Sequence, residues 1–198
     1  LFGCGGHARS VINVITKINK TIEVLLVDES AQENEIILGC MTKSCYQLDI
    51  QDKYLIAVGD NQKRKTIYET ILLGKRGNNI SIVSSDASIG VGTNVGKGTF
   101  VAPNAYIGPK VHIGNNVIIN TASIVEHEVI IGNHTHIAPH ATICGRSKIG
   151  NEVFCGAGSV IIDNIAICDN VIVGAGAVVH KDITEPGIYV GVPARKIK

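Results

Sequence analysis

An apolar side chain recurs at every sixth position over nearly half of this sequence. From Ile89 to Val179, sixteen successive positions spaced six residues apart are all apolar. The residue that follows is usually small, as in Gly90, Gly96 and Ala102. This period matches neither the 3.6-residue turn of an α-helix nor the alternation of an ordinary strand. A fixed period of six residues predicts a parallel β-helix.

Three such hexads complete one triangular coil of 18 residues, so residues i and i+18 stack about 4.8 Å apart, as neighbouring strands do. We therefore predict a left-handed parallel β-helix, the fold of hexapeptide-repeat proteins, over residues 83–198 with a C-terminal tail. This handedness departs from the usual right-handed crossover. A β-helix this slim exposes flat faces, and closing it into a homotrimer is the expected way to protect them. Functional sites then form between neighbouring subunits.

Residues 1–82 lack the six-residue period and have the pattern of a small Rossmann-like α/β domain. Its expected strands are the apolar runs at 24–27 and 54–58, each of which ends in polar residues. Because the chain opens at Leu1 in what resembles the end of a strand, we expect the N-terminal strand to be truncated. The apolar faces of the two expected helices are formed by Val11, Val14, Ile15 and Ile18, and by Ile67, Ile71 and Leu72, with Gly74 as the stop.

The first turn, Gly3-x-Gly5-x-x-Ala8, is a shortened form of the dinucleotide-binding fingerprint. Glycines let the backbone approach phosphate oxygens, and a helix N-terminus offers unpaired N–H groups. Asp28, after the next strand, is placed to hold ribose or sugar hydroxyls. The same residues also fit a tight strand-to-helix turn with no ligand. The domain is short for NAD, so a mononucleotide or a nucleotide sugar fits better.

One corner of the repeat carries a Glu-His-Glu sequence, at Glu126, His127 and Glu128. His127 lies two residues beyond the inward-pointing Val125, and Gly145 occupies the matching position one coil further on. An imidazole beside a carboxylate, next to a bare glycine with a free N–H, has the parts for general-base acyl transfer. In that interpretation the Gly145 N–H holds the oxyanion of the tetrahedral intermediate.

Other functions remain open for these histidines. An exposed corner histidine can simply be solvated, and His134, His136 and His140 could form a zinc cluster on the following corners. A zinc carbonic anhydrase with the same fold is disfavoured, because no two histidines are five residues apart. A non-catalytic trimer that binds a nucleotide sugar is the remaining alternative.

The composition of the chain argues against two classes of binding partner, nucleic acids and membranes. The net charge of +1 argues against nucleic acid, and no apolar run approaches the ~18 residues of a membrane span. The six cysteines show no C-x-x-C spacing, so we expect reduced thiols in a cytoplasmic protein that requires no metal.

Four features together resemble one family. They are Phe-Gly-Cys-Gly-Gly-His-Ala at 2–8, the hexads, Val-Glu-His-Glu at 125–128, and Gly-Val-Pro-Ala-Arg-Lys at 191–196. The chain resembles the sugar O/N-acetyltransferases that include the sialic acid O-acetyltransferases and the UDP-4-amino-sugar N-acetyltransferases of the bacillosamine pathway. The segment at 59–64 is similar to the family's Gly-Asn-Asn-x-x-Arg, with Asp60 replacing the first Asn.

The resemblance implies an acetyl-CoA-dependent N-acetyltransferase of glycan biosynthesis, acting on the 4-amino group of a UDP-linked amino-dideoxy sugar. Sialic acid O-acetylation is the alternative within the family, and Glu128 favours the amino-sugar branch. The resemblance implies that His127 is the base and Glu128 its partner. The nucleotide-sugar site it implies is Gly5, Gly6, His7, Asp28, Asp60 and Asn61. The acetyl-CoA site it implies is His136, Gly145, Lys181, Arg195 and Lys196.

Overall fold

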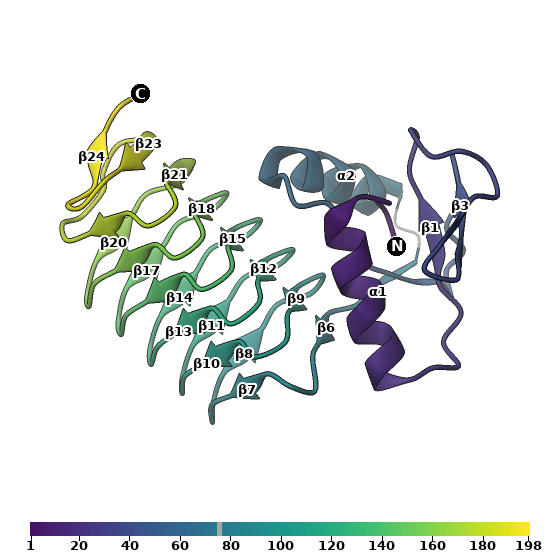
Figure 1. Cartoon of the computed structure of the whole chain (residues 1–198), viewed down its shortest axis with the longest axis horizontal. Coiled ribbons are helices and arrows are strands. Elements are labelled where there is room, and N and C mark those ends of the chain that lie inside the picture. The colour runs from purple at the N-terminus through teal and green to yellow at the C-terminus, as the bar shows by residue number, and fades with distance from the viewer. Residues whose placement is uncertain (75–76) are drawn as a thin grey trace.

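The computed structural model describes residues 1–74 and 77–198. A small N-terminal α/β part leads into a left-handed β-helix whose coils stack toward the C-terminus (Figure 1). Both parts of the predicted fold class are confirmed.

The N-terminal part is a short sheet accompanied by two helices. Strands β1 and β3 run parallel, and β2 joins β3 in an antiparallel hairpin. The extended residues 1–3 lie between β1 and residues 55–57, with the Phe2 N–H donating to the Leu55 oxygen at 3.0 Å. The elements are α1 (Gly6–Ile18), β1 (Leu25–Val27), β2 (Ile36–Ile37), β3 (Cys40–Lys43), β4 (Lys53–Tyr54), α2 (Asn61–Gly74) and β5 (Asn78–Asn79).

Both predicted helices are present, and three of the four residues expected on the apolar face of α1 are buried (Val11, Val14 and Ile15). Ile18 is not, and half of its surface is exposed. The helix ends at this residue, and residues 19–23 that follow are all exposed, so none of them covers Ile18. The β2–β3 hairpin was not predicted, because its strands are too short to show a pattern.

The β-helix has three faces, each a sheet of very short strands. The first face contains β7 (Ser88–Ile89), β10 (Tyr106–Ile107), β13 (Ile124–Val125), β16 (Thr142–Ile143), β19 (Val160–Ile161) and β22 (Val178–Val179). The second contains β8 (Asn94–Val95), β11 (His112–Ile113), β14 (Ile130–Ile131), β17 (Lys148–Ile149) and β20 (Ala166–Ile167). The third contains β6 (Ile82–Val83), β9 (Phe100–Val101), β12 (Ile118–Ile119), β15 (His136–Ile137), β18 (Phe154–Cys155), β21 (Val171–Val173), β23 (Gly187–Val190) and β24 (Arg195–Lys196).

The predicted register of 18 residues holds from coil to coil. Ile107 pairs with Val125, and Val125 pairs with Ile143, all in parallel strands. These three side chains are completely buried, and they belong to one continuous core along the axis. The small hydroxyl residues of the repeat also lie inside, where they satisfy backbone groups at the corners. The Thr135 hydroxyl, for example, donates to the Gly150 oxygen at 2.8 Å and accepts from the Val153 N–H at 3.1 Å.

Side-chain amides line the corner between the second and third faces. The N–H of Asn115 donates to Oδ1 of Asn133, and the N–H of Asn133 donates to Oδ1 of Asn151, each at 2.8 Å. The N–H of Asn151 donates in turn to Oδ1 of Asp169 at 2.7 Å. This ladder satisfies the backbone donors of that corner. The corner between the first and second faces has a different composition, which we describe below.

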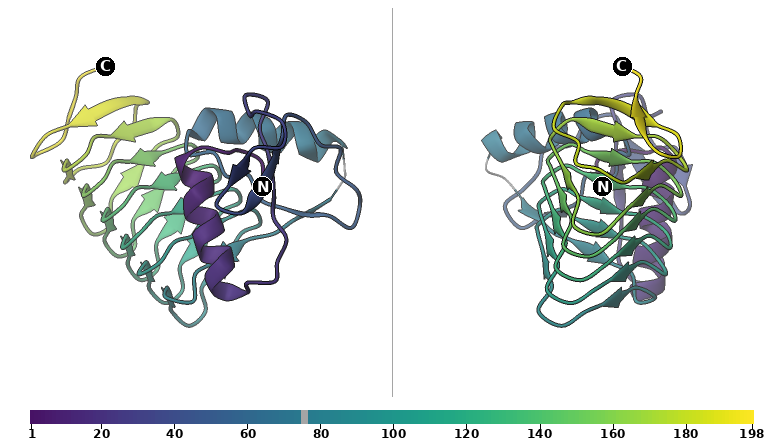
Figure 2. Two further views of the ribbon diagram at one scale, coloured as in Figure 1. Left: turned by 45° about the vertical axis from the view of Figure 1, so that its right-hand side comes forward. Right: turned by 90° about the vertical axis from the view of Figure 1, so that its left-hand side faces the viewer.

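The N-terminal part packs against the third face of the β-helix (Figure 2). Helix α1 contributes Val11 and Ile15 to a buried cluster that also contains Phe100 and Ile118 of the third face. This packing leaves the corner between the first and second faces on the side of the β-helix opposite the N-terminal part.

Candidate active site

The corner between the first and second faces carries the predicted base. We call it the His127 edge, and its successive residues, one per coil, are Pro109, His127, Gly145, Asp163 and Lys181. Among the described residues this corner has no amide ladder. Pro109, Asp163 and Lys181 are exposed, whereas Gly145 is buried beneath the imidazole of His127. The imidazole of His127 is 42% exposed in the single chain.

His127 lies directly against Gly145 of the next coil. A Cβ placed on Gly145 would be 2.6 Å from both Cε1 and Nε2 of the imidazole, closer than any real side chain can approach. Nδ1 of the imidazole is 3.1 Å from Oε2 of Glu128. A carboxylate only accepts hydrogen bonds, so Nδ1 is the donor in this pair, and in the neutral form of the imidazole Nε2 presents its lone pair. The stacking of His127 on Gly145 is the arrangement predicted from the period.

The backbone N–H of Gly145 is the next element of the candidate site. The N–H of the following residue, Arg146, donates to the His127 oxygen at 2.9 Å. Among the residues that the structure describes, no group accepts a hydrogen bond from the Gly145 N–H itself. A free donor beside an imidazole lone pair suits an oxyanion that forms next to a base.

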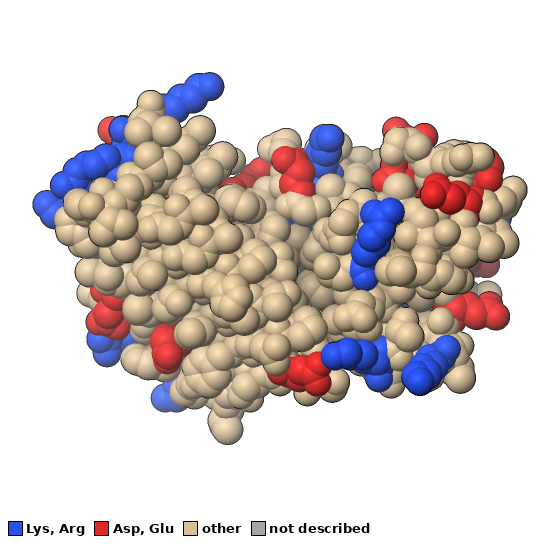
Figure 3. All heavy atoms as spheres, viewed as in Figure 1, with Lys and Arg blue, Asp and Glu red and all other residues tan. Residues whose placement is uncertain are grey.

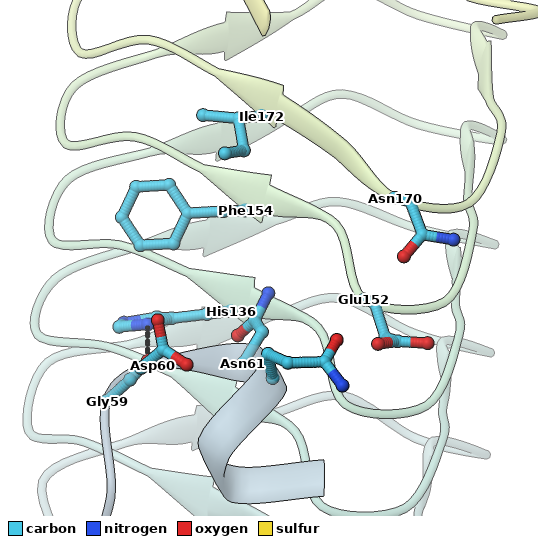
Figure 4. A pocket seen from close by; sticks show the side chains of 9 residues that line it. Gly59, Asp60, Asn61, His136, Glu152, Phe154, Asn170 and Ile172 are labelled. Atoms are coloured by element: carbon cyan, nitrogen blue, oxygen red, sulfur yellow. Dashed lines mark hydrogen bonds between the residues drawn. The ribbon is translucent and has the colours of Figure 1, made fainter. Parts of the chain in front are cut away.

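A second part of the candidate site lies on the third face, beneath the start of α2. Here a cavity of about 490 Å³ opens between the β-helix and the loop that leads into this helix (Figure 4). Its lining combines amide, carboxylate and aromatic side chains: Gly59, Asp60, Asn61, Gln62, His136, Glu152, Phe154, Asn170 and Ile172. Of the predicted site residues, this cavity brings together Asp60, Asn61 and His136.

His136 is held on both ring nitrogens by groups of the same chain. Nδ1 lies 3.1 Å from the Gly59 oxygen, and Nε2 lies 3.1 Å from Nδ2 of Asn120. Burial lowers the pKa of His136 to about 4, and the nearby Arg64 cation acts in the same direction. His136 is therefore neutral at pH 7, with Nδ1 donating to Gly59 and Nε2 accepting from Asn120.

The three histidines considered for a zinc cluster do not assemble. His136 faces the cavity, whereas Nδ1 of His134 lies 2.8 Å from the Asn116 amide, and its ring packs edge-on against Tyr68. Within residues 1–74 and 77–198, no three His, Cys, Asp or Glu side chains are arranged to hold a metal ion. In the same ranges, no helix is both long enough and apolar enough to cross a membrane.

His7 lies in the first turn of α1, close to the same cavity. Its ring packs edge-on against Phe100 at 5.2 Å and lies 6.4 Å from the ring of His136. Nε2 of His7 is buried, with no hydrogen-bond partner among the described residues. Burial lowers the pKa of His7 to about 3, so this imidazole is also neutral at pH 7.

Gly5 and Gly6 begin α1 with no side-chain cap, and a Cβ on either residue would meet only open space. The packing of the chain therefore does not require these glycines. Among the described residues no group accepts a hydrogen bond from either N–H, which leaves both available to a phosphate. Gly3 is different, because its φ is +113° and a Cβ there would lie 2.8 Å from the Ala57 oxygen. The turn contains one structural glycine and two that border free space.

The two acidic residues predicted at the nucleotide site, Asp28 and Asp60, also organise their own loops. Oδ2 of Asp28 accepts from the Cys4 N–H at 3.0 Å, and Oδ1 accepts from the Ser30 hydroxyl at 2.6 Å. Burial raises the pKa of Asp28, but the hydrogen bonds from Ser30 and Cys4 outweigh it and hold the pKa below its usual value. Asp60 caps α2, since its Oδ1 accepts from the Lys63 N–H at 2.8 Å.

Arg64, which the sequence analysis left outside the site, links the two parts of the molecule. Its side chain is completely buried and donates within α2's own loop to the oxygens of Val58 and Gly59. Across the interface it donates to the oxygens of Asn116 at 3.0 Å and His134 at 2.7 Å. The sequence pattern at 59–64 ends in this arginine and could have drawn attention to it. Its hydrogen bonds to the β-helix could not be predicted, because they depend on how the two parts pack.

The predicted phosphate-binding cations lie toward the C-terminal end of the β-helix. Lys181 is exposed on the His127 edge, three coils beyond His127. Arg195 and Lys196 form the short β24, and Lys196 pairs with Glu185 at 2.9 Å. Figure 3 shows Lys and Arg side chains gathered at this end, while the face of the β-helix in view is largely uncharged.

Two family models match the chain. The PglD N-terminal domain matches residues 1–71, and the bacterial transferase hexapeptide (six repeats) matches residues 92–121. Both matched segments agree with the two parts of the observed fold.

Solved structures of two acetyltransferases are similar over nearly the whole chain. The acetyltransferase domain of PglB from Neisseria gonorrhoeae, in complex with acetyl coenzyme A, is 26% identical with a TM-score of 0.87, covering 99% of this chain and 97% of that domain. PerB from Caulobacter crescentus, in complex with CoA and GDP-perosamine, is 25% identical with a TM-score of 0.86. The match covers 100% of this chain and 95% of the PerB chain. This chain therefore combines a PglD N-terminal domain with a hexapeptide-repeat β-helix, and over nearly its whole length it is similar to these acetyltransferases.

Proposed function

We propose that this protein transfers the acetyl group of acetyl-CoA to the amino group of a nucleotide-linked amino-dideoxy sugar, with His127 as general base. The observation that carries this proposal is the imidazole of His127 against the bare Gly145, with Glu128 on its other nitrogen. The similarity to PerB, crystallised with CoA and GDP-perosamine, supports a sugar amine as the acceptor. We place the reaction at the 4-amino group of a UDP-linked sugar.

The chemistry follows from the tautomer of His127. Nε2 takes a proton from the attacking amine as the new N–C bond forms, and Glu128 stabilises the resulting imidazolium. The thioester oxygen becomes an oxyanion, which the free N–H of Gly145 stabilises. The tetrahedral intermediate then collapses, the C–S bond breaks, and the imidazolium returns the proton to the sulfur of CoA.

The N-terminal part is proposed to bind the nucleotide. Gly5 and Gly6 offer free N–H groups at the start of α1 for the phosphates, and His7 lies one residue further on. Asp28 remains able to accept from a sugar or ribose hydroxyl, because each carboxylate oxygen accepts more than one hydrogen bond. Asp60 and Asn61 border the adjoining cavity on the third face, where the sugar would extend.

Acetyl-CoA is proposed to lie along the His127 edge. From the acetyl group at Gly145 the molecule would extend toward Lys181, which is about 14 Å from His127 at the spacing of three coils. Lys181, Arg195 and Lys196 are then available for its phosphates. In this arrangement both ring nitrogens of His136 are hydrogen-bonded on the third face, to Asn120 and Gly59, so His136 does not serve as a second base.

The two halves of this site lie on opposite sides of one chain, since the His127 edge is opposite the third face that carries the cavity. We therefore propose a homotrimer in which the His127 edge of one subunit meets the third face of its neighbour. Exposed aliphatic side chains on the first and second faces, such as Ile124 and Ile130, are available for that contact.

The test is a screen of acceptors with acetyl-CoA that monitors free thiol. UDP- and GDP-linked 4-amino-dideoxy sugars are compared with free and CMP-linked sialic acids. We expect steady thiol release with an amino sugar and an N-acetyl product. Acetylation of sialic acids alone would replace the proposed substrate, and binding of nucleotide sugars without any turnover would indicate a non-catalytic trimer.

A further inference from the structure

A carboxylate faces His127 across the bare glycine. Asp163 occupies the His127 edge one coil beyond Gly145, and its Oδ1 would be 3.1 Å from a Cβ on that glycine. Nε2 of His127 would be 2.6 Å from the same point. Nε2 of His127 and Oδ1 of Asp163 are therefore at most about 5.7 Å apart, the sum of these two distances, so a single nitrogen atom between them can donate a hydrogen bond to each.

Asp163 forms an ion pair with its neighbour on the surface of this corner. Its Oδ2 pairs with Nη2 of Arg146, and the backbone of Arg146 is itself hydrogen-bonded to the His127 oxygen. Oδ1, the oxygen that faces Gly145, has no hydrogen-bond partner among the residues that the structure describes. Asp163 thus offers one engaged oxygen and one oxygen free to accept from a ligand.

The two groups that face each other are both acceptors. Nε2 of His127 presents a lone pair, because Glu128 fixes the proton on Nδ1. A neutral amine has two N–H bonds and one lone pair, so it can donate to both acceptors while its lone pair attacks the thioester. A hydroxyl has a single O–H bond. If that bond donates to His127, the Asp163 carboxylate faces an oxygen lone pair and stays unpaired.

We propose that Asp163 is a specificity-determining residue that receives the acceptor's amine opposite His127 and so selects N-acetylation over O-acetylation. This inference rests on the proposed function. It assigns the enzyme's preference for an amine over a hydroxyl acceptor to one side chain. The carboxylate also attracts the amine in its ammonium form, which loses one proton to solvent before attack. During attack, one N–H bond donates to Asp163, and the proton of the other passes to His127.

The competing partner for Oδ1 is an amide N–H of CoA, since the proposed path of CoA along this edge passes Asp163. The two assignments differ in the substrate whose binding depends on the carboxylate. Loss of the carboxylate should weaken binding of the amino sugar if the amine is the partner of Oδ1. It should weaken binding of acetyl-CoA if the amide is the partner.

The experiment compares 4-amino-dideoxy sugars with their 4-hydroxy counterparts, linked to UDP or GDP, in wild-type protein, Asp163→Ala and Asp163→Asn. We expect the ratio of kcat/KM for the amine over the hydroxyl to fall about 10- to 100-fold in Asp163→Ala. The KM for the amino sugar should rise, while the KM for acetyl-CoA stays unchanged. Asp86→Asn is the matched control, because it removes a carboxylate from an exposed ion pair, with Lys17, far from Gly145.

Each ratio is measured within one variant, so partial misfolding does not alter it. An unchanged ratio in both Asp163 variants would overturn the inference while leaving the proposed function intact, as would a defect confined to the KM for acetyl-CoA. A wild-type protein that acetylates only hydroxyls would overturn the proposed function as well. Equilibrium binding of the same sugar pairs in the presence of CoA gives the ratio of their dissociation constants without turnover. An equal ratio in wild type and Asp163→Ala would again overturn the inference.

Discussion

The imidazole of His127 lies on the backbone of Gly145, with Cε1 and Nε2 each 2.6 Å from the place where a Cβ would be. This contact exists because residues 18 apart stack in the β-helix, and because the residue at the second position has no side chain. It follows that the position of the proposed base depends on the absence of a single methyl group.

Gly145→Ala should displace the imidazole, because a methyl group at this position cannot fit within 2.6 Å of the ring. We expect kcat for acetyl transfer to fall about 10- to 100-fold, since small displacements of catalytic groups cost this much. Thermal unfolding should change little, because the ring can rotate outward. Gly74→Ala is the control, since a Cβ at that position meets open space. Wild-type kcat in Gly145→Ala would show that the ring does not work from this position.

Arg64→Met should destabilise the protein by roughly 3 kcal/mol, because it leaves several buried carbonyl oxygens without their donor. The affected groups include the oxygens of Gly59, Asn116 and His134. The measurement is the free energy of unfolding in urea at a fixed protein concentration. Lys63→Met, one residue earlier on an exposed part of α2, should stay within about 0.5 kcal/mol of wild type. Equal stabilities of the two variants would contradict the role of Arg64 in joining the two parts.

Acid should destabilise the fold through His136. Its pKa is about 4 in the folded protein and near 6.5 when unfolded, so below pH 6.5 the unfolded chain binds a proton that the folded chain does not. This stability is fully present above pH 6.5 and is lost as the pH falls toward 4, by about 3 kcal/mol. His136→Gln should therefore lose less stability than wild type between pH 7 and pH 4.5 in urea unfolding. Parallel losses in the two proteins would show that His136 titrates normally.

Mixed oligomers test whether the site is shared between subunits. His127→Ala removes the proposed base, and Asn61→Ala removes a side chain of the cavity on the opposite side of the chain. If each site combines the His127 edge of one subunit with the third face of its neighbour, refolding the two inactive variants together regenerates some complete sites. Acetyl transfer should then recover to roughly a quarter of the wild-type rate in an equal mixture, by random assembly. No recovery above either variant alone would place both groups in the same subunit's site.

The repeat made much of this structure predictable. The six-residue period predicted the coils, and the 18-residue stack placed Gly145 beside His127 before any coordinates were known. The same arithmetic leads from Gly145 to Asp163, so the facing carboxylate could have been found from the sequence. The left-handed φ of 60° at Glu128 and 59° at Arg146 also recurs every six residues, at positions where the repeat often has Gly or Asn.

The N-terminal part was less predictable, because its contacts depend on how two unlike structures pack. No local pattern in the sequence predicts the full burial of Arg64. Nor does one predict the neutral imidazole of His136 with a hydrogen bond at each ring nitrogen. Both arise where the loop before α2 meets the third face of the β-helix. The hydrogen bonds of Asp28 and Asp60 within their own loops likewise required the coordinates.

The most direct test is the rate of acetyl transfer to a nucleotide-linked 4-amino sugar in wild type, Glu128→Gln and His127→Ala. The proposed mechanism predicts that His127→Ala lowers kcat by about 10²- to 10⁴-fold with little change in either KM, and that Glu128→Gln gives an intermediate loss. A His127→Ala enzyme that N-acetylates the sugar at the wild-type rate would contradict the assignment of this imidazole as the base.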